Sequence, residues 1–233
     1  MVSGLAVSTR IAWPKTYRII RSIYPPIDLF EDIADPRDWE ALAAVEAKTN
    51  PRIRYEIGDI GKVPASRRVG GPGASLVMAP FVHCSMDRPG RFTDGNYGIY
   101  YAGDTEEVAL AETIHHHEHF MRATKENEGW TSDFRVLIGS IDRVLHDVSS
   151  VPDVLHPTDY GPSQREGRGL RDGGSDGLTW NSVRMDGGKC IGVFWPNVVT
   201  IPVQGRHYGY HWNGKRVDFV KRHDDGIVLS VSP

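Results

Sequence analysis

Along this chain, segments with the pattern of β-strands outnumber helical segments, and the two kinds do not alternate regularly. A regular alternation of strands and helices would predict a parallel sheet covered by helices. The irregular order instead predicts an α+β fold whose core is a curved, largely antiparallel sheet with flanking helices. Because the length suits one large domain, we expect residues 1–233 to form a single domain, with residues 1–74 as an N-terminal elaboration.

The expected strands are short runs rich in β-branched and aromatic residues, bounded by Gly, Pro or Asn. They cover residues 16–24, 75–84, 98–103, 134–141, 190–195, 198–203 and 226–231. Asn213-Gly214 is a favoured hairpin turn and should join two further strand segments. Two stretches rich in Gly and Pro are expected as loops, residues 58–74 and residues 150–177, the latter mobile and with one short helix near residues 163–170.

Two longer helices are predicted from their start signals. Asp35 can cap a helix over residues 36–48, and Pro36 fits its first position. Asp104 opens the clearest helix, since Asp104 and Glu107 have the spacing of a capping box.

Composition and charge narrow the class of protein. The net charge of −3 provides no basic surface for nucleic acid or for an anionic membrane. No apolar run approaches the roughly 18 residues that cross a bilayer, and the N-terminus lacks the basic start of a signal peptide. Cys84 and Cys190 form no zinc motif and are expected to be two buried thiols. These features favour the cytoplasm.

Residues 90–120 carry the densest set of chemically useful side chains, and they run from a loop through a strand into a helix. Arg91 lies in the loop, Tyr101 on the strand, and Glu112 about two turns into the helix. Glu112 is away from the apolar stripe of that helix, which consists of Leu110, Ile114 and Met121. It can therefore face a cleft rather than the core.

These three residue types suit cleavage of the nicotinamide–ribose bond of NAD⁺. The nicotinamide leaving group is already cationic, so the transition state resembles an oxocarbenium ion. A carboxylate stabilises that developing charge, an Arg clamps the pyrophosphate, and an aromatic ring stacks on nicotinamide. By spacing alone the trio is weak evidence, because most Arg, Tyr and Glu side chains lie on surfaces or in packing positions.

Longer sequence motifs indicate the function more specifically than these three residues do. They are TYRII at residues 16–20, PPIDLFED at 25–32, GPGAS at 71–75, GRF with YYAGDTEEVALAETIHH between 90 and 116, GSDGLTWNSVRMDGGKCIGVFWP at 174–196, and PVQGRHYGYHWNG at 202–214. In this order, and over nearly the whole chain, they resemble the RES-domain family. That resemblance implies a fold similar to the ADP-ribosyltransferases. It also implies a toxin of a toxin–antitoxin pair (RES–Xre type) that is ParT-like and uses NAD⁺ as a substrate, with a cognate antitoxin covering the active site.

The resemblance also assigns site residues. Arg91, Tyr101 and Glu112 match the catalytic positions, while Arg18, Arg91, Tyr101 and Ser182 match positions that bind NAD⁺. Ser182 stands in Trp180-Asn181-Ser182-Val183-Arg184, which departs from the usual YPSVR of the family. The departure keeps the serine but changes the wall of the pocket beside it.

Three weaker motifs have structural explanations as well. His115 and His119 lie four residues apart on a helix and could bind a metal ion. No third ligand is evident, so we expect histidines on the surface of the helix. His116, one turn after Glu112, is the best placed of the group for a role in the site. Residues 70–73 could cradle a phosphate but fit a plain turn better. Asp224-Asp225 is expected to be a solvated turn.

Several functions therefore remain open. The favoured one is an NAD⁺-dependent toxin that transfers ADP-ribose to a cytoplasmic protein. The alternatives are NAD⁺ degradation by phosphorolysis or hydrolysis, and a non-catalytic binding module on the same fold. A metal hydrolase using the histidines lacks a ligand set, and no metal, nucleic acid or membrane is expected as a partner.

Overall fold

A computed structural model describes residues 6–23, 34–48 and 58–231, and its described strands form one eight-stranded sheet in the order β1-β2-β5-β4-β3-β6-β7-β8. The strands are β1 (Val7–Arg21), β2 (Tyr100–Gly103), β3 (Thr131–Asp147), β4 (Gly177–Asn181), β5 (Lys189–Val193), β6 (Val203–Trp212), β7 (Val217–Arg222) and β8 (Val228–Ser230). Among the pairings of these strands, only that between β3 and β4 is parallel. The predicted α+β class with a largely antiparallel sheet is confirmed.

The sheet closes on itself through β1, which pairs with both β2 and β3. The strands β1, β2, β5, β4 and β3 thus form a closed ring, and β6, β7 and β8 continue the sheet beyond β3. The β1–β3 register shifts between Trp13 and Thr16, where Pro14 has no backbone N–H to give to the ladder. Such closure requires curved strands, as the sequence led us to expect.

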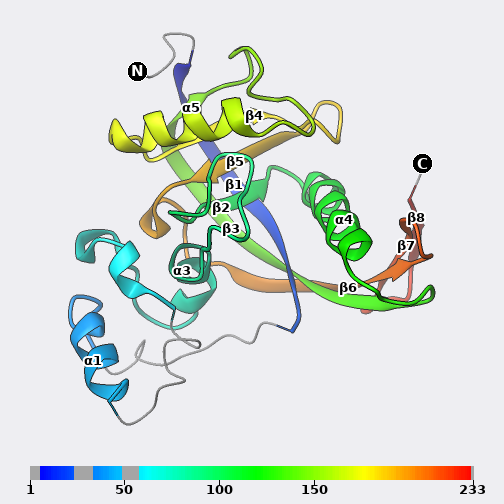
Figure 1. Ribbon diagram of the computed structural model, residues 1–233, viewed down its shortest axis with the longest axis horizontal. Helices are drawn as coiled ribbons and strands as arrows, with labels where there is room; N and C mark the ends of the chain where they lie inside the picture. The colour runs from blue at the N-terminus through cyan, green and yellow to red at the C-terminus, as the bar shows by residue number, and fades with distance from the viewer. Residues whose placement is uncertain (1–5, 24–33, 49–57, 232–233) are drawn as a thin grey trace.

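The described helices are α1 (Trp39–Glu46), α3 (Ala74–Val82), α4 (Glu106–Ala123) and α5 (Gly161–Asp172), with short 3₁₀ turns η1 (Ile60–Lys62), η2 (Ala65–Arg67) and η3 (Pro196–Val198). Figure 1 shows α5 beside β4, α4 beside β1 and β2, and α1 at the opposite side of the molecule from α5. Each of α3, α4 and α5 covers its own apolar cluster on the sheet. None of the described helices is long and apolar enough to cross a membrane.

The strand predicted at residues 75–84 is wrong, because the chain forms α3 there. Most of this segment is buried, so its apolar residues follow neither a period of two nor one of 3.6, and a buried strand and a buried helix cannot be told apart by pattern. The turn at residues 70–73 carries a signal for the start of this helix. Gly73 has a φ of 80°, a left-handed conformation that glycine adopts without steric cost. The plain turn expected at residues 70–73 thus serves as the N-cap of α3.

The strand predicted at residues 198–203 is also wrong for most of its length. A 3₁₀ turn ends at Val198, and β6 begins only at Val203. Pro202 cannot donate to a strand ladder, and Thr200 instead bonds through its backbone N–H to the carbonyl of Ser140 at 3.1 Å.

Strand β4 was not predicted, because residues 177–181 follow directly on the segment expected as a loop. The other predicted elements agree with the structure apart from their ends. The predicted first helix is shorter, α1, and the short helix expected within residues 150–177 is longer, α5. The loop at residues 58–74 contains η1 and η2. The PPIDLFED segment at residues 25–32 lies outside the described residues.

Candidate functional site

Helix α4 begins with a cap that differs from the predicted one. The hydroxyl of Thr105 accepts a hydrogen bond from the backbone N–H of Val108 at 3.2 Å, so Thr105 and not Asp104 is the N-cap. Asp104 instead accepts from the backbone N–H of Lys189 at 3.1 Å, which ties the start of α4 to β5. Gly103 permits this close approach, because a Cβ there would lie 2.9 Å from Val108.

Glu112 stands on α4 away from the buried Leu110 and Met121, as expected, and its side chain is 21% exposed. The Ser182 hydroxyl, on the loop after β4, donates to Glu112 Oε1 at 2.9 Å across 70 positions of the chain. The thiol of Cys190 on β5 lies 3.8 Å from the same oxygen. Burial raises the pKa of Cys190 well above its ordinary value, so the thiol stays protonated and can donate to the carboxylate.

Arg184 completes the surroundings of Glu112. Its Nη1 lies 3.4 Å from Glu112 Oε2, and its side chain is only 10% exposed. The backbone N–H of Arg184 donates to the Ser182 hydroxyl at 3.2 Å, so one short loop supplies neighbours for both carboxylate oxygens. We call Arg91, Glu112, Ser182 and Arg184 the Glu112 cluster.

Arg91 is buried, with 6% exposure, in a loop that α5 holds in place. The Ser163 hydroxyl donates to the Arg91 carbonyl at 2.6 Å. The Arg91 guanidinium lies over the ring of Tyr160, 4.7 Å from its centroid, and Nη1 donates to the His156 carbonyl at 2.8 Å. Burial lowers the pKa of Arg91; the Tyr160 ring and the Glu112 carboxylate act in the opposite direction, and the charge of Arg184 lowers it further. The charges of Glu112 and Arg184 thus act on Arg91, although its direct contacts are with His156, Tyr160 and Ser163.

Tyr101 supports this loop through its hydroxyl, which accepts a hydrogen bond from the backbone N–H of Phe92 at 3.1 Å. Its ring packs edge-on against Trp180, with centroids 6.1 Å apart. Burial raises the pKa of Tyr101 well above its ordinary value, so the side chain is a neutral phenol. The substitution at Trp180, noted in the sequence as a departure from the family pattern, thus forms the wall behind Tyr101.

Arg18 on β1 makes a different set of contacts. Its Nη1 donates to the carbonyl of Tyr101 at 3.1 Å, and its guanidinium lies 4.9 Å from the centroid of the Tyr100 ring. Burial lowers the pKa of Arg18. Within the described part of the chain, these contacts place Arg18 against β2 rather than in the Glu112 cluster, and its role in binding NAD⁺ stays a prediction.

The histidines of α4 divide between surface and core. His116 and His119 are exposed, whereas His117 is buried with 4% exposure and packs edge-on against Phe134 at 5.0 Å. No group of three or more His, Cys, Asp or Glu side chains among the described residues could hold a metal ion. Cys190 is buried as expected, but Cys84 is only half-buried, so that prediction is wrong for Cys84.

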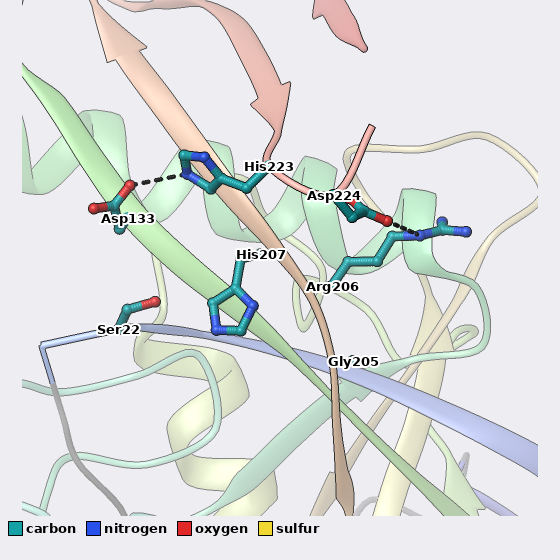
Figure 2. Close-up of a pocket in the computed structure, with 7 residues that line it drawn as sticks. All are labelled: Ser22, Asp133, Gly205, Arg206, His207, His223 and Asp224. Carbon is teal, nitrogen blue, oxygen red and sulfur yellow. Dashed lines mark hydrogen bonds and ion pairs between the residues drawn. The ribbon is translucent and has the colours of Figure 1, made fainter. Parts of the chain in front are cut away.

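A separate hollow of about 750 Å³ opens between β6, β7 and the ends of β1 and β3 (Figure 2). Its charged groups are already paired: His223 Nε2 lies 3.1 Å from Asp133 Oδ1, and Arg206 Nε lies 3.4 Å from Asp224 Oδ2. It contains none of the predicted site residues. We therefore place the candidate site at the Glu112 cluster, where a carboxylate, a hydroxyl and a guanidinium group are in contact.

Two residues of this site were missed in the sequence. Arg184 is the last residue of the NSVR motif. Its position two residues after Ser182 is the signal that could have identified it. Tyr160 lies in a stretch predicted as a mobile loop, and only the folded chain shows it against Arg91.

Comparison with protein families identifies one family. The RES domain matches residues 66–213, well over half of the chain. A curated protein from Sinorhizobium fredii, uncharacterized protein y4oC, is 28% identical over 213 residues, which cover 90% of this chain and 87% of that protein. Among solved structures, the M. tuberculosis MbcT–MbcA toxin–antitoxin complex aligns with a TM-score of 0.43 and 8% identity, covering 88% of this chain and 87% of that chain.

Proposed function

The chain belongs to the RES domain family, and from this premise we propose that it is an enzyme that cleaves the nicotinamide–ribose bond of NAD⁺. The observation that carries the proposal is the direct contact between Ser182 and Glu112, at 2.9 Å. The charge of Glu112 also acts on the buried Arg91. Residues that the family resemblance assigned separately, on different segments, form one polar cluster. A contact between two such residues 70 positions apart is not expected by chance.

The roles follow from the chemistry of the bond. Glu112, held by the Ser182 hydroxyl, stabilises the positive charge that develops on the ribose as nicotinamide leaves. Arg91 binds the pyrophosphate of NAD⁺ with its planar donors. Tyr101, a neutral aromatic ring against Trp180, is the group we propose to stack on nicotinamide. NAD⁺ is consumed as a substrate, and no resident metal is part of this scheme.

The variant Glu112→Gln tests the proposal. It keeps the size of the side chain and its contact with Ser182 but removes the negative charge that the cation requires. We expect nicotinamide release from NAD⁺ to fall by about 10²–10³-fold, with the circular dichroism spectrum unchanged. Glu107→Gln, an exposed position on the same helix, is the matched control and should keep full activity. Equal nicotinamide release from the two variants would contradict the assignment.

For the acceptor of ADP-ribose we propose a side chain of a cytoplasmic protein. The chain has more surface than NAD⁺ hydrolysis requires, including α1 and the η1–η2 segment. NAD⁺ labelled in its adenylate half should, in cell lysate, label a discrete protein band that disappears with Glu112→Gln. Label recovered only in free ADP-ribose or its phosphate would favour hydrolysis or phosphorolysis. If Glu112→Gln and wild type both release no nicotinamide, the non-catalytic alternative takes precedence.

We also propose a protein partner. An enzyme that consumes NAD⁺ harms the cell that makes it, so a cognate antitoxin should cover the site near Arg91 and residues 150–177. Such a toxin–antitoxin role fits the family resemblance, and we propose that the protein acts in the cytoplasm, where NAD⁺ is available.

A further inference from the structure

The Glu112 cluster contains two guanidinium groups, those of Arg91 and Arg184, and one carboxylate, that of Glu112. The charges of Arg184 and Glu112 both act on Arg91. Arg91 is 6% exposed, and the side chain of Arg184 is 10% exposed. Bringing two like charges together in a buried place is unfavourable unless negative charge compensates them. Glu112 can compensate only one of the two.

The hydrogen-bond donors of these guanidinium groups are also incompletely used. Nη2 of Arg91, and Nε and Nη1 of Arg184, are buried without a hydrogen-bond partner among the described residues. The 3.4 Å between Arg184 Nη1 and Glu112 Oε2 exceeds the roughly 2.7–2.9 Å of a charge-assisted hydrogen bond. Arg184 is therefore near Glu112 without being bound firmly to it. Buried unpaired donors cost free energy, and an active site retains them when a ligand satisfies them.

The positive field of the pair extends to the neighbouring helix. Burial lowers the pKa of His115 to about 4, and the charge of Arg184 is the next largest cause. His115 thus stays neutral at neutral pH and adds no third positive charge.

We propose that Arg184 joins Arg91 in binding a phosphate group through the unpaired donors of both guanidinium groups. This assignment rests on the proposed function for the identity of the ligand, where the pyrophosphate of a dinucleotide supplies the oxygens. A free phosphate ion offers the same chemistry. Arg184 is then a substrate-binding residue that also contacts Glu112.

The test uses ADP, which has a pyrophosphate but no nicotinamide bond to cleave, so binding is measured apart from catalysis. Calorimetry should show that ADP binds the wild-type protein, and that Arg184→Gln weakens the Kd by about 10- to 100-fold, the range expected for a lost hydrogen bond to a charged group. Arg143→Gln, an exposed arginine on β3, is the matched control and should bind ADP like the wild type. Arg184→Lys keeps the charge and should be intermediate, which covers the case that the Gln variant folds poorly.

Two further measurements test the effect of Glu112 on ADP binding and the identity of the ligand. Glu112→Gln removes the only carboxylate of the cluster and should tighten ADP binding, because the phosphate no longer meets a negative neighbour. Inorganic phosphate that binds with the same dependence on Arg184 would support the site and assign it to the free ion, whereas a response to ADP alone would assign it to the dinucleotide. Sulfate at equal ionic strength should bind more weakly than ADP.

The proposal is overturned if Arg184→Gln and Arg184→Lys bind ADP as tightly as the wild type, or if ADP binds the wild type no better than sulfate does. These outcomes are separate from those of the proposed function. ADP binding that depends on Arg184 without any nicotinamide release would retain the phosphate site and reject the enzyme activity. Nicotinamide release together with ADP binding that does not depend on Arg184 would reject the phosphate site and retain the enzyme activity.

Discussion

Arg91 is the side chain whose surroundings are most specialised in the candidate site. Its guanidinium is held between the ring of Tyr160 and the carbonyl of His156, at 4.7 Å and 2.8 Å. Its Nη2 has no hydrogen-bond partner among the residues that the structure describes. A planar fork can stack, donate to the carbonyl and still present donors to a ligand, whereas an ammonium group is a point charge on a flexible stem.

At the residue scale, Arg91→Lys should therefore weaken NAD⁺ binding although the charge is retained. We expect the Kd measured by calorimetry in a Glu112→Gln background, which slows turnover, to rise by about tenfold or more. Arg143→Lys in the same background serves as the control. Unchanged affinity for NAD⁺ would place Arg91 outside the binding site.

At the scale of elements, α4 has to serve the core and the site at once. Its buried side includes Val108, Leu110 and Met121, and this packing fixes the direction in which Glu112 points. His117 lies on the buried side too, and its Nε2 has no hydrogen-bond partner within the described part of the chain. A proton on this ring would be a buried charge without an acceptor.

This histidine predicts a pH dependence of stability. Burial, and next the charge of Arg21, lower the pKa of His117 from 6.5 to about 4. Between these pH values His117 binds a proton in the unfolded chain but not in the folded protein. The contribution of His117 to the free energy of unfolding is therefore fully present above pH 6.5 and is lost as the pH falls towards 4. The loss from this group amounts to at most about 3 kcal/mol.

Urea unfolding at several pH values measures the effect. His117→Leu should flatten the dependence of the unfolding free energy between pH 6.5 and pH 4 relative to the wild type. The exposed His119→Leu should leave the dependence as it is. The same slope in wild type and His117→Leu would show that His117 does not stay neutral in the fold.

At the scale of the whole molecule, the closed ring of β1, β2, β5, β4 and β3 joins the first strand to the later part of the chain. Residues 7–21 pair with β3 along most of their length. We propose on this basis that the chain acts as one domain. The prediction of an N-terminal elaboration over residues 1–74 does not extend to β1, which is part of the central sheet.

The toxin–antitoxin proposal makes its prediction at this scale. Expression of the wild-type chain alone should arrest growth and lower cellular NAD⁺, because nothing covers the Glu112 cluster. Glu112→Gln should relieve the arrest at an equal protein level, and so should co-expression of the cognate antitoxin. Free growth of cells that contain the wild-type protein, with normal NAD⁺, would argue against a toxin that needs a partner.

Local chemistry explains why much of the fold was predictable. The strands with alternating or β-branched residues, the hairpin at Asn213-Gly214 and the helix that contains Glu112 all carry signals within a few neighbouring residues. Helix α3 and residues 198–203 were mispredicted because their state depends on burial and on which backbone partners are available.

The site divides in the same way between sequence and tertiary structure. The sequence by itself determined the residue types and, through its motifs, singled out Arg91, Tyr101, Glu112 and Ser182. Only the tertiary structure decided that Ser182 and Arg184 flank the Glu112 carboxylate, and that Tyr160 packs on Arg91. Contacts between positions 70 apart depend on the closing of the sheet and the packing of α4 and α5, and no local pattern encodes that distance.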